Sequence, residues 1–188
     1  MMKNAKRQST EGFSDWVEGI IRNFCLESPD NSLKNKVNER AWDEPLIGFS
    51  SGSDPLYPQL KMDIGSFFWT PIEVFEKSFR QIAASPSDLT VISWVLPQTR
   101  ATKADNRKEA IYPSERWVRS RLHGEAFNAK LRKYVVDTLQ KAGFEAVAPV
   151  ASPSWAWETS LRYGFSSKWS ERHAAYVSGL GTFGLSMD

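Results

Sequence analysis

Cysteine and histidine are scarce in this sequence, which has 1 Cys and 2 His in 188 residues. A lone cysteine, Cys25, cannot form a disulfide within the chain. Together with His123 and His173 it supplies too few ligands for a zinc site built from Cys and His, or for an iron–sulfur cluster. Because Cys25 lies on the apolar side of a helical pattern, we expect it to be buried as a small hydrophobic residue.

Long apolar runs and an excess of one charge are also missing. No stretch is long and apolar enough for a membrane span, and the opening MMKNAKRQST lacks the apolar core of a signal peptide. We therefore expect no membrane partner and a cytoplasmic location. The 24 Lys and Arg nearly balance the 22 Asp and Glu, so a basic binding surface would have to be local.

Aromatic residues, by contrast, are plentiful. They make up 13% of the chain and include 8 Trp, and hydrophobic residues as a whole make up 41%. This composition favours a packed globular protein over disorder. A chain of this length buries roughly 70% of its unfolded surface around one core. We expect a disordered tail over residues 1–9 and a single domain over residues 10–188.

Apolar periodicity and capping signals predict four helices. Their expected ranges are about 11–26, 70–84, 114–142, and a short helix that begins at Ser170. The second has the strongest start signal, T-P-I-E, which combines an N-cap hydroxyl, a proline at the first helical position and a glutamate that can bond back. Gly143 is suited to end the third helix.

Two segments read as strands. The stretch LTVISWVL, residues 89–96, concentrates β-branched and large apolar side chains and predicts a buried central strand, and FEAVAPV, residues 144–150, predicts a second. The connecting segments are expected to be irregular over 27–66, an exposed loop or weak helix over 98–112, and an aromatic-rich loop over 151–169. This mixture of elements indicates a layered α+β or α/β domain.

Near the C-terminal end, SGLGTFG places Gly179, Gly181 and Gly184 in a G-x-G-x-x-G pattern. A phosphate-binding loop of this type requires a buried strand before the first glycine and a helix after the third. Here a helix start at Ser170 precedes the glycines, and only four residues follow them. We therefore expect a bend without side chains that packs against the rest of the domain, and not a dinucleotide site.

Other candidate chemistry is left open by the residues alone. His173 falls at the third position of the expected short helix, where its ring can face a ligand or satisfy a local hydrogen bond. The 114–142 segment carries seven Lys and Arg against three carboxylates, which suits either phosphate binding or a solvated helix face. The tryptophans between 155 and 169 can stack on a planar ligand or pack in a core.

The stretch WSERHAAYVSGLGTFGLS resembles a motif of the epoxyqueuosine reductase family, whose relatives include the corrinoid-dependent reductive dehalogenases. In that family a Glu-Arg pair opens a short helix that runs into Gly-Leu-Gly with a further glycine. Four more segments are similar to a branch described as ferredoxin-like iron–sulfur proteins: PLIGFSSGSDPLYPQLKMDIG, FFWTPIEVF, TVISWVLPQT and PSERWVRSRLHGEAFN. Together the similar segments lie within about residues 40–186.

This resemblance implies a nitroreductase-like α+β fold, in which a central, mostly antiparallel sheet flanked by helices holds a corrinoid (cobalamin). The glycines would let backbone approach the ring or a neighbouring strand. The cofactor-binding residues that it implies are Arg172, His173, Tyr176, Gly179, Gly181 and Gly184.

The departures from the family pattern limit the expected activity. The position of the family's aspartate falls near Phe165, and its Asp-Tyr-His run aligns with Ala126, Phe127 and Asn128, so the expected proton donor is missing. The family continues into a hairpin and a cluster-binding iron–sulfur domain that this sequence lacks. We therefore expect a corrinoid-binding or degenerate reductase domain that is inactive alone, incomplete at its C-terminus, and dependent on a separate iron–sulfur electron donor.

Two other hypotheses stay open beside this one. The chain could be a non-catalytic interaction or scaffold protein of the same fold, with the aromatic segment 155–169 as its partner surface. It could also be an RNA-binding accessory domain that contacts tRNA through the basic helix. Without the family's hairpin an edge of the sheet would be exposed, and this predicts a homodimer formed through that edge.

Overall fold

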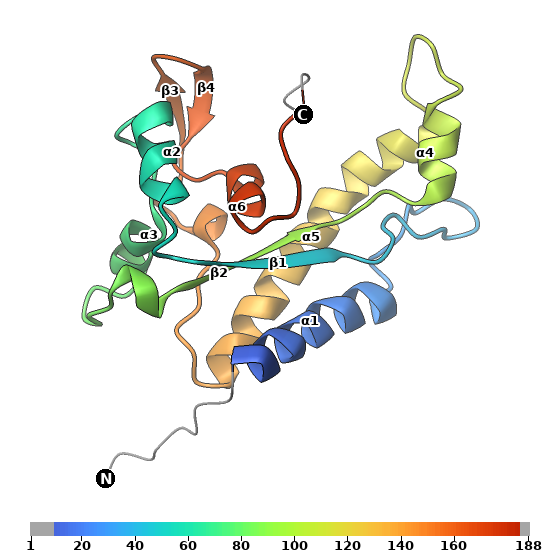
Figure 1. Cartoon of the computed structure of the whole chain (residues 1–188). Helices are drawn as coiled ribbons and strands as arrows, with labels where there is room; N and C mark the ends of the chain where they lie inside the picture. The colour runs from blue at the N-terminus through green and yellow to red at the C-terminus, as the bar shows by residue number, and fades with distance from the viewer. Residues whose placement is uncertain (1–9, 185–188) are drawn as a thin grey trace. The chain divides into compact units, whose positions relative to one another are not determined.

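The computed structural model describes residues 10–184, so the expected disordered tail over 1–9 lies outside the described residues. The chain forms two compact units, each built from two separate stretches (Figure 1). One unit comprises Met1–Pro45 and Leu96–Leu131, and the other comprises Leu46–Val95 and Arg132–Asp188. We call them unit 1 and unit 2 and describe each by itself. The expectation of a single domain over 10–188 stays a prediction.

Unit 1 is helical in its described part. It contains α1 (Thr10–Glu27), α4 (Arg100–Asn106) and the beginning of α5 (Glu115–Lys141). The apolar stripe of α1 and that of α5 form its core, where the rings of Phe24 and Phe127 lie 5.6 Å apart. Cys25 is 1% exposed, as expected, and burial raises the pKa of its thiol to about 11 despite the nearby Arg40.

The amide of Asn31 and a close contact of Trp42 help to order the segment between α1 and Pro45. The Asn31 side chain donates to the backbone oxygens of Cys25 and Trp42, at 2.9 and 3.1 Å, and accepts from the Trp42 backbone N–H at 2.9 Å. The Trp42 indole packs where Gly124 of α5 has no side chain, since a β-carbon there would lie 2.1 Å from the ring. This packing explains a glycine within the helix.

Unit 2 contains the strands. Strands β1 (Leu46–Ser51) and β2 (Thr90–Val95) pair antiparallel, and β3 (Trp157–Ser160) and β4 (Gly164–Ser167) form a separate antiparallel hairpin. Its other elements are α2 (Leu56–Ile64), α3 (Pro71–Ser78), α6 (Glu171–Val177), the end of α5 and the short 3-10 turns Pro86–Asp88 and Pro149–Ala151. Its buried core includes Tyr57, Trp69, Val74, Trp169 and Ala174.

Several expectations are confirmed. The described residues form an α+β structure with antiparallel pairing, and α1, β2, α5 and the start of α6 lie where the sequence predicts them. The Thr70 capping box is present, and the Thr70 backbone N–H donates to the Glu73 carboxylate at 2.8 Å. Gly143 ends α5 with φ 90°, while the Phe144 N–H bonds the Leu139 oxygen at 3.1 Å, as in a Schellman motif.

Three element predictions were wrong, and a fourth was incomplete. The segment 27–66 is irregular over most of its length, as expected, but it also contains β1 and α2, which the sequence did not indicate; 151–169 contains a hairpin where a loop was expected. The helix expected to reach residue 84 ends at Ser78, where the hydroxyl bonds the Val74 oxygen at 2.9 Å and mostly exposed residues follow. Residues 144–150 form no strand, since Val147 and Val150 pack individually against the core cluster of unit 2.

The strands of the described part also do not form one central sheet. They are divided between two sheets of two strands each, so β2 has β1 as its only ladder partner there. The reason is that the second expected strand is absent and the hairpin β3–β4 pairs only with itself. Among the helices that are described, none has the length and apolar character needed to cross a bilayer.

Candidate functional site around helix α6

Helix α6 places His173 beside its own N-cap residue. The Ser170 hydroxyl accepts a hydrogen bond from the His173 backbone N–H at 3.4 Å and lies 2.8 Å from Nδ1 of the same residue. The imidazole is therefore held by a local bond, and this was one of the two roles that the sequence left open. Its other ring nitrogen, Nε2, has no hydrogen-bond partner among residues 10–184.

Two aromatic rings contact this half-buried imidazole. Phe68 meets it edge-on at 6.0 Å between ring centres, and Phe183 lies 4.8 Å away at an angle of 43°. The Tyr176 ring, one turn further along α6, lies 5.7 Å from that of Phe183. Burial, and secondarily the charge of Arg172, lowers the pKa of His173 below its ordinary value. The imidazole is consequently neutral at neutral pH.

The first of the three glycines ends α6. Gly179 has φ 74°, its N–H bonds the Tyr176 oxygen, and the Leu180 N–H bonds the Ala175 oxygen, both at 3.0 Å. This is a Schellman motif, in which a left-handed residue at the helix end favours glycine. No atom of the described structure lies within 4 Å of a β-carbon built on Gly179, Gly181 or Gly184. These three glycines therefore do not provide the close approach to a neighbouring strand that the sequence suggested.

The close approach is instead made at Gly48 of β1. A β-carbon on Gly48 would lie 2.6 Å from the Ser178 oxygen and 2.9 Å from Cγ of Leu180. The end of α6 thus packs directly on the backbone of the strand. The glycine that allows this contact is therefore Gly48 on the strand, and the backbone that approaches it is that of Ser178 at the end of α6.

A cluster of hydroxyls fixes the same end of α6. The Ser178 hydroxyl lies 3.1 Å from those of Ser50 on β1 and Ser93 on β2, and the Ser50 hydroxyl lies 2.8 Å from that of Tyr57 on α2. Tyr57 is 1% exposed, and burial raises the pKa of its phenol to about 12. Two strands and one helix are therefore linked to the glycine turn through neutral groups.

The start of α6 is fixed by an ion pair. Glu171, the first member of the Glu-Arg pair, lies 3.1 Å from Nε of Arg132 on α5, and the Arg132 side chain is 13% exposed. Arg172, the second member, is exposed. Within this pair, glutamate therefore has an anchoring position and arginine faces outward, where it can contact a ligand.

The residues at the family's acid positions lie elsewhere. Phe165 is on β4 and 75% exposed, and Ala126, which aligns with the aspartate of the Asp-Tyr-His run, is an exposed residue of α5. Neither side chain can transfer a proton. The sequence missed Phe68, Phe183, Gly48 and the hydroxyl cluster as parts of the α6 site. The one local signal was Gly48 between the apolar residues Ile47 and Phe49, because a glycine inside a strand often marks a close backbone approach.

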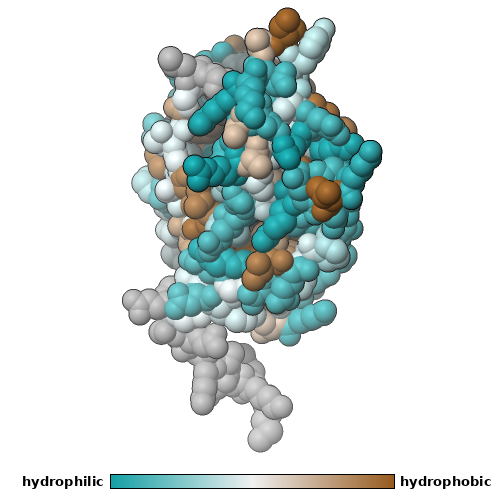
Figure 2. Space-filling view, turned by 90° about the vertical axis from the view of Figure 1, so that its right-hand side faces the viewer, coloured by the Kyte–Doolittle hydropathy of each residue, from teal (hydrophilic) through white to brown (hydrophobic). Residues whose placement is uncertain are grey.

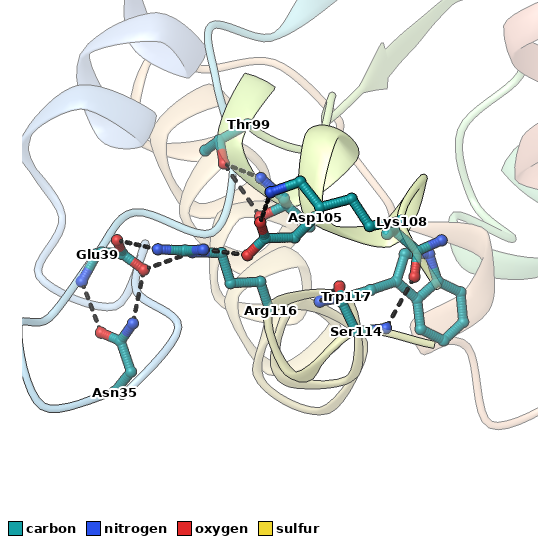
Figure 3. A network of polar contacts seen from close by, with 10 residues as sticks. Asn35, Glu39, Thr99, Asp105, Lys108, Ser114, Arg116 and Trp117 are labelled. Atoms are coloured by element: carbon teal, nitrogen blue, oxygen red, sulfur yellow. Dashed lines mark hydrogen bonds and ion pairs between the residues drawn. The ribbon is translucent and has the colours of Figure 1, made fainter. Parts of the chain in front are cut away.

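The basic surface of α5 is largely paired. In unit 1, Arg116 lies between the carboxylates of Glu39 and Asp105 (Figure 3), with both bonds to Glu39 at 2.9 Å. Asn35 donates to the same Glu39 carboxylate at 2.7 Å. These bonds to Arg116 lower the pKa of both carboxyl groups. The further ion pairs of α5 cations are Arg119–Glu115, Lys130–Asp30, Arg132–Glu171 and Lys133–Asp137.

The hairpin β3–β4 presents an aromatic surface. Trp157 is 60% exposed and Phe165 is 75% exposed, and their rings stack at 4.6 Å. Trp155 meets Trp157 edge-on at 4.9 Å. On the face drawn in Figure 2, by contrast, hydrophilic residues predominate and hydrophobic ones are scattered. Exposed aromatic residues that contact one another are a common feature of interaction surfaces.

Three kinds of binding group lie on or beside α6. A held imidazole nitrogen can coordinate a metal, aromatic rings can contact a macrocycle, and an exposed guanidinium can bind amide and phosphate oxygens at its rim. Among residues 10–184 no group of three or more His, Cys, Asp or Glu side chains could hold a metal ion. No protein-family model matches the chain, and the comparisons with curated proteins and with solved structures gave no match.

Proposed function

We propose that this chain is a corrinoid-binding domain of nitroreductase-like fold, related to epoxyqueuosine reductase and not catalytic by itself. The ligand would lie against α6 and the turn that follows it. The residues assigned to binding remain Arg172, His173, Tyr176, Gly179, Gly181 and Gly184, and the aromatic rings of Phe68 and Phe183 are added to them.

One observation carries the proposal. The motif that resembles the reductase family lies where an imidazole is held by Ser170 among aromatic rings, with Nε2 lacking a partner in the described part of the chain. The glycine turn is itself fixed, because Ser178 packs on Gly48 and bonds the hydroxyl cluster. A rigid turn beside a ring nitrogen is what a preorganised ligand site requires.

The chain's own residues support binding more than catalysis. Phe165 and Ala126 stand where the family places acids, and neither can supply a proton. A bound corrinoid would supply cobalt redox chemistry, and its electrons would come from a separate iron–sulfur donor. His173 and Arg172 would orient the ligand, and the flanking phenylalanines would keep water from one side of it.

The experiment is co-elution with hydroxocobalamin. Purified protein is mixed with the corrinoid and passed through a desalting column, and the visible spectrum of the protein fraction is recorded. We expect the colour to elute with the protein, and the double variant R172A/Y176A to lose it. A matched control is R162A/Y163A, which removes another Arg–Tyr pair, stacked at 5.2 Å on the hairpin. Elution of colourless wild-type protein would contradict the proposal.

A second candidate function is protein interaction through the hairpin β3–β4. The stacked, exposed rings of Trp157 and Phe165 favour it, and the partner proposed is a second copy of the chain. Sedimentation at tens of micromolar tests this proposal, with a dimer expected for the wild type and a monomer for W157S/F165S. A wild-type monomer would count against the homodimer.

The RNA hypothesis has less support. Five cations of α5 form ion pairs with carboxylates: Arg116, Arg119, Lys130, Arg132 and Lys133. A cation that is paired with a carboxylate attracts a phosphate less strongly than an unpaired one does. Salt-sensitive binding of tRNA, together with failure to retain hydroxocobalamin, would favour the RNA-binding function over the corrinoid-binding one.

A further inference from the structure

We propose that α4 and the loop after it, residues 107–113, dock on an anionic lipid surface, with Ile111 and Tyr112 inserted among the lipid headgroups. This surface belongs to unit 1 and α6 belongs to unit 2, so lipid docking does not depend on corrinoid binding. The absence of a spanning segment, which led us to expect no membrane partner, does not bear on a loop that binds at the membrane surface.

Three cations follow one face of α4. Arg100, Lys103 and Arg107 are three and four residues apart, a spacing that places side chains on the same side of a helix. All three are exposed, and within the described part of the chain their side chains form no hydrogen bond or ion pair. Thr102, which is 0% exposed, and Asp105 lie on the other side of the helix. The cationic face is therefore available to a polyanionic partner.

Two large apolar side chains lie in the loop that follows this face. Ile111 is 85% exposed and Tyr112 is 77% exposed. In Figure 1 the loop projects beyond the end of α4 and the beginning of α5. Adjacent apolar side chains among polar ones indicate an interaction site, and tyrosine is enriched where a membrane meets water.

The base of the loop is fixed on both sides. The Asn106 side chain accepts a hydrogen bond from the Ser114 backbone N–H at 2.9 Å, and the Asp105 carboxylate pairs with Arg116 at the start of α5 (Figure 3). These contacts hold the two ends of the loop together before any partner binds. Less order therefore has to be gained when the loop docks.

The loop favours a lipid surface over a nucleic acid. Cations alone would suit either partner, since both present phosphate groups. The Tyr112 ring could stack on a base, but Ile111 has no flat face to stack and gains free energy by leaving water for an apolar medium. The apolar pair and the cationic face together match a bilayer that is negatively charged outside and apolar inside.

The experiment is co-sedimentation of the full chain with vesicles. Vesicles of phosphatidylcholine alone are compared with vesicles of phosphatidylcholine and phosphatidylserine. We expect the protein to sediment with the vesicles that contain phosphatidylserine and to stay in solution with the others. Added salt should weaken the binding, because it screens the attraction between the cations and the lipid charges.

One pair of variants tests the apolar residues. I111S/Y112S should weaken vesicle binding by about 10-fold, because it removes the side chains that enter the headgroup region. The matched control is M62S/L122S, which removes two other apolar side chains that are 80% and 69% exposed and should leave binding unchanged.

A second set of variants tests the charges. R100Q/K103Q/R107Q should weaken binding by about 10-fold or more, and E109Q should strengthen it by removing an exposed carboxylate of the loop. The matched control is R80Q/R121Q/K141Q, which removes three exposed cations elsewhere and changes the net charge equally. This control should bind as the wild type does.

Three results would overturn the lipid surface. They are equal binding of the wild type to both kinds of vesicle, binding to neither, and undiminished binding by I111S/Y112S. Tighter binding of a single-stranded oligonucleotide than of the vesicles, lost in R100Q/K103Q/R107Q, would also overturn it and assign the cations to nucleic acid. Retention of hydroxocobalamin is measured separately, so each proposal can fail without the other.

Discussion

The backbone oxygen of Ser178 lies 2.6 Å from the place where a side chain on Gly48 would begin. This contact joins the end of α6 to β1 and makes the strand glycine, more than the turn glycines, the position that tolerates no side chain.

Replacing this strand glycine is therefore expected to destabilise the protein. G48A places a methyl group against backbone, which cannot move as a flexible side chain would, and the expected cost is about 1–3 kcal/mol. The midpoint of urea unfolding measures it. The matched control is G19A in α1, where no atom lies within 4 Å of the added carbon and alanine should stabilise by roughly 0.5–1 kcal/mol. Equal midpoints for G48A and wild type would refute the close contact.

Replacing Gly179, the glycine that ends α6, should also destabilise the protein, but for a different reason. G179A faces no clash, but alanine at φ 74° is expected to cost about 1 kcal/mol. G179N should recover part of this loss, because asparagine tolerates the left-handed region. G184A serves as the control and should change the urea midpoint little, since Gly184 has neither a positive φ nor a close neighbour. A larger loss in G184A than in G179A would contradict the assigned Schellman motif.

The ion pairs of Arg116 with Glu39 and Asp105 should make the free energy of unfolding depend on pH in the acid range. Glu39 and Asp105 have lowered pKa values when folded, so the stability they give is complete above their unfolded values, near pH 4, and is lost as pH falls through the folded ones. R116M should lower the urea midpoint at neutral pH, and its difference from wild type should shrink at about pH 3. K133M, which removes an exposed pair with Asp137, is the control. If the difference in urea midpoint between R116M and wild type did not change with pH, the loss of stability would come from packing of the Arg116 side chain and not from its charge.

The ionisation of His173 provides a fourth test. Its lowered pKa means that the unfolded chain binds the proton more readily, so the stability from this group is present at higher pH and falls as pH drops below about 6.5. Proton NMR of the ring should show titration below the ordinary range, and R172Q should shift it upward by removing a nearby positive charge. If His173 titrated with the ordinary pKa of histidine, its ring would be exposed to solvent, and this would contradict its packing against Phe183.

Elements with strong local signals could be predicted. The apolar stripes of α1 and α5, the Thr70 capping box and the N-cap at Ser170 each depend on residues close in the chain, so the sequence indicated them correctly. Strand β1 was missed because its glycine and serines resemble a loop, and it is stabilised by pairing with β2, some forty positions away. The expected strand over 144–150 failed because its apolar residues pack singly against the core.

The sequence by itself determined helices α1 and α5, the caps at Thr70 and Ser170, the burial of Cys25 and the place of the candidate motif on α6. Tertiary structure alone decided that His173 lies beside Phe68, that Gly48 admits the backbone of Ser178, and that Arg116 is neutralised by Glu39. The physical reason is distance along the chain. Caps and apolar stripes arise from neighbours within a few residues, whereas these contacts join segments whose meeting depends on how the whole unit packs.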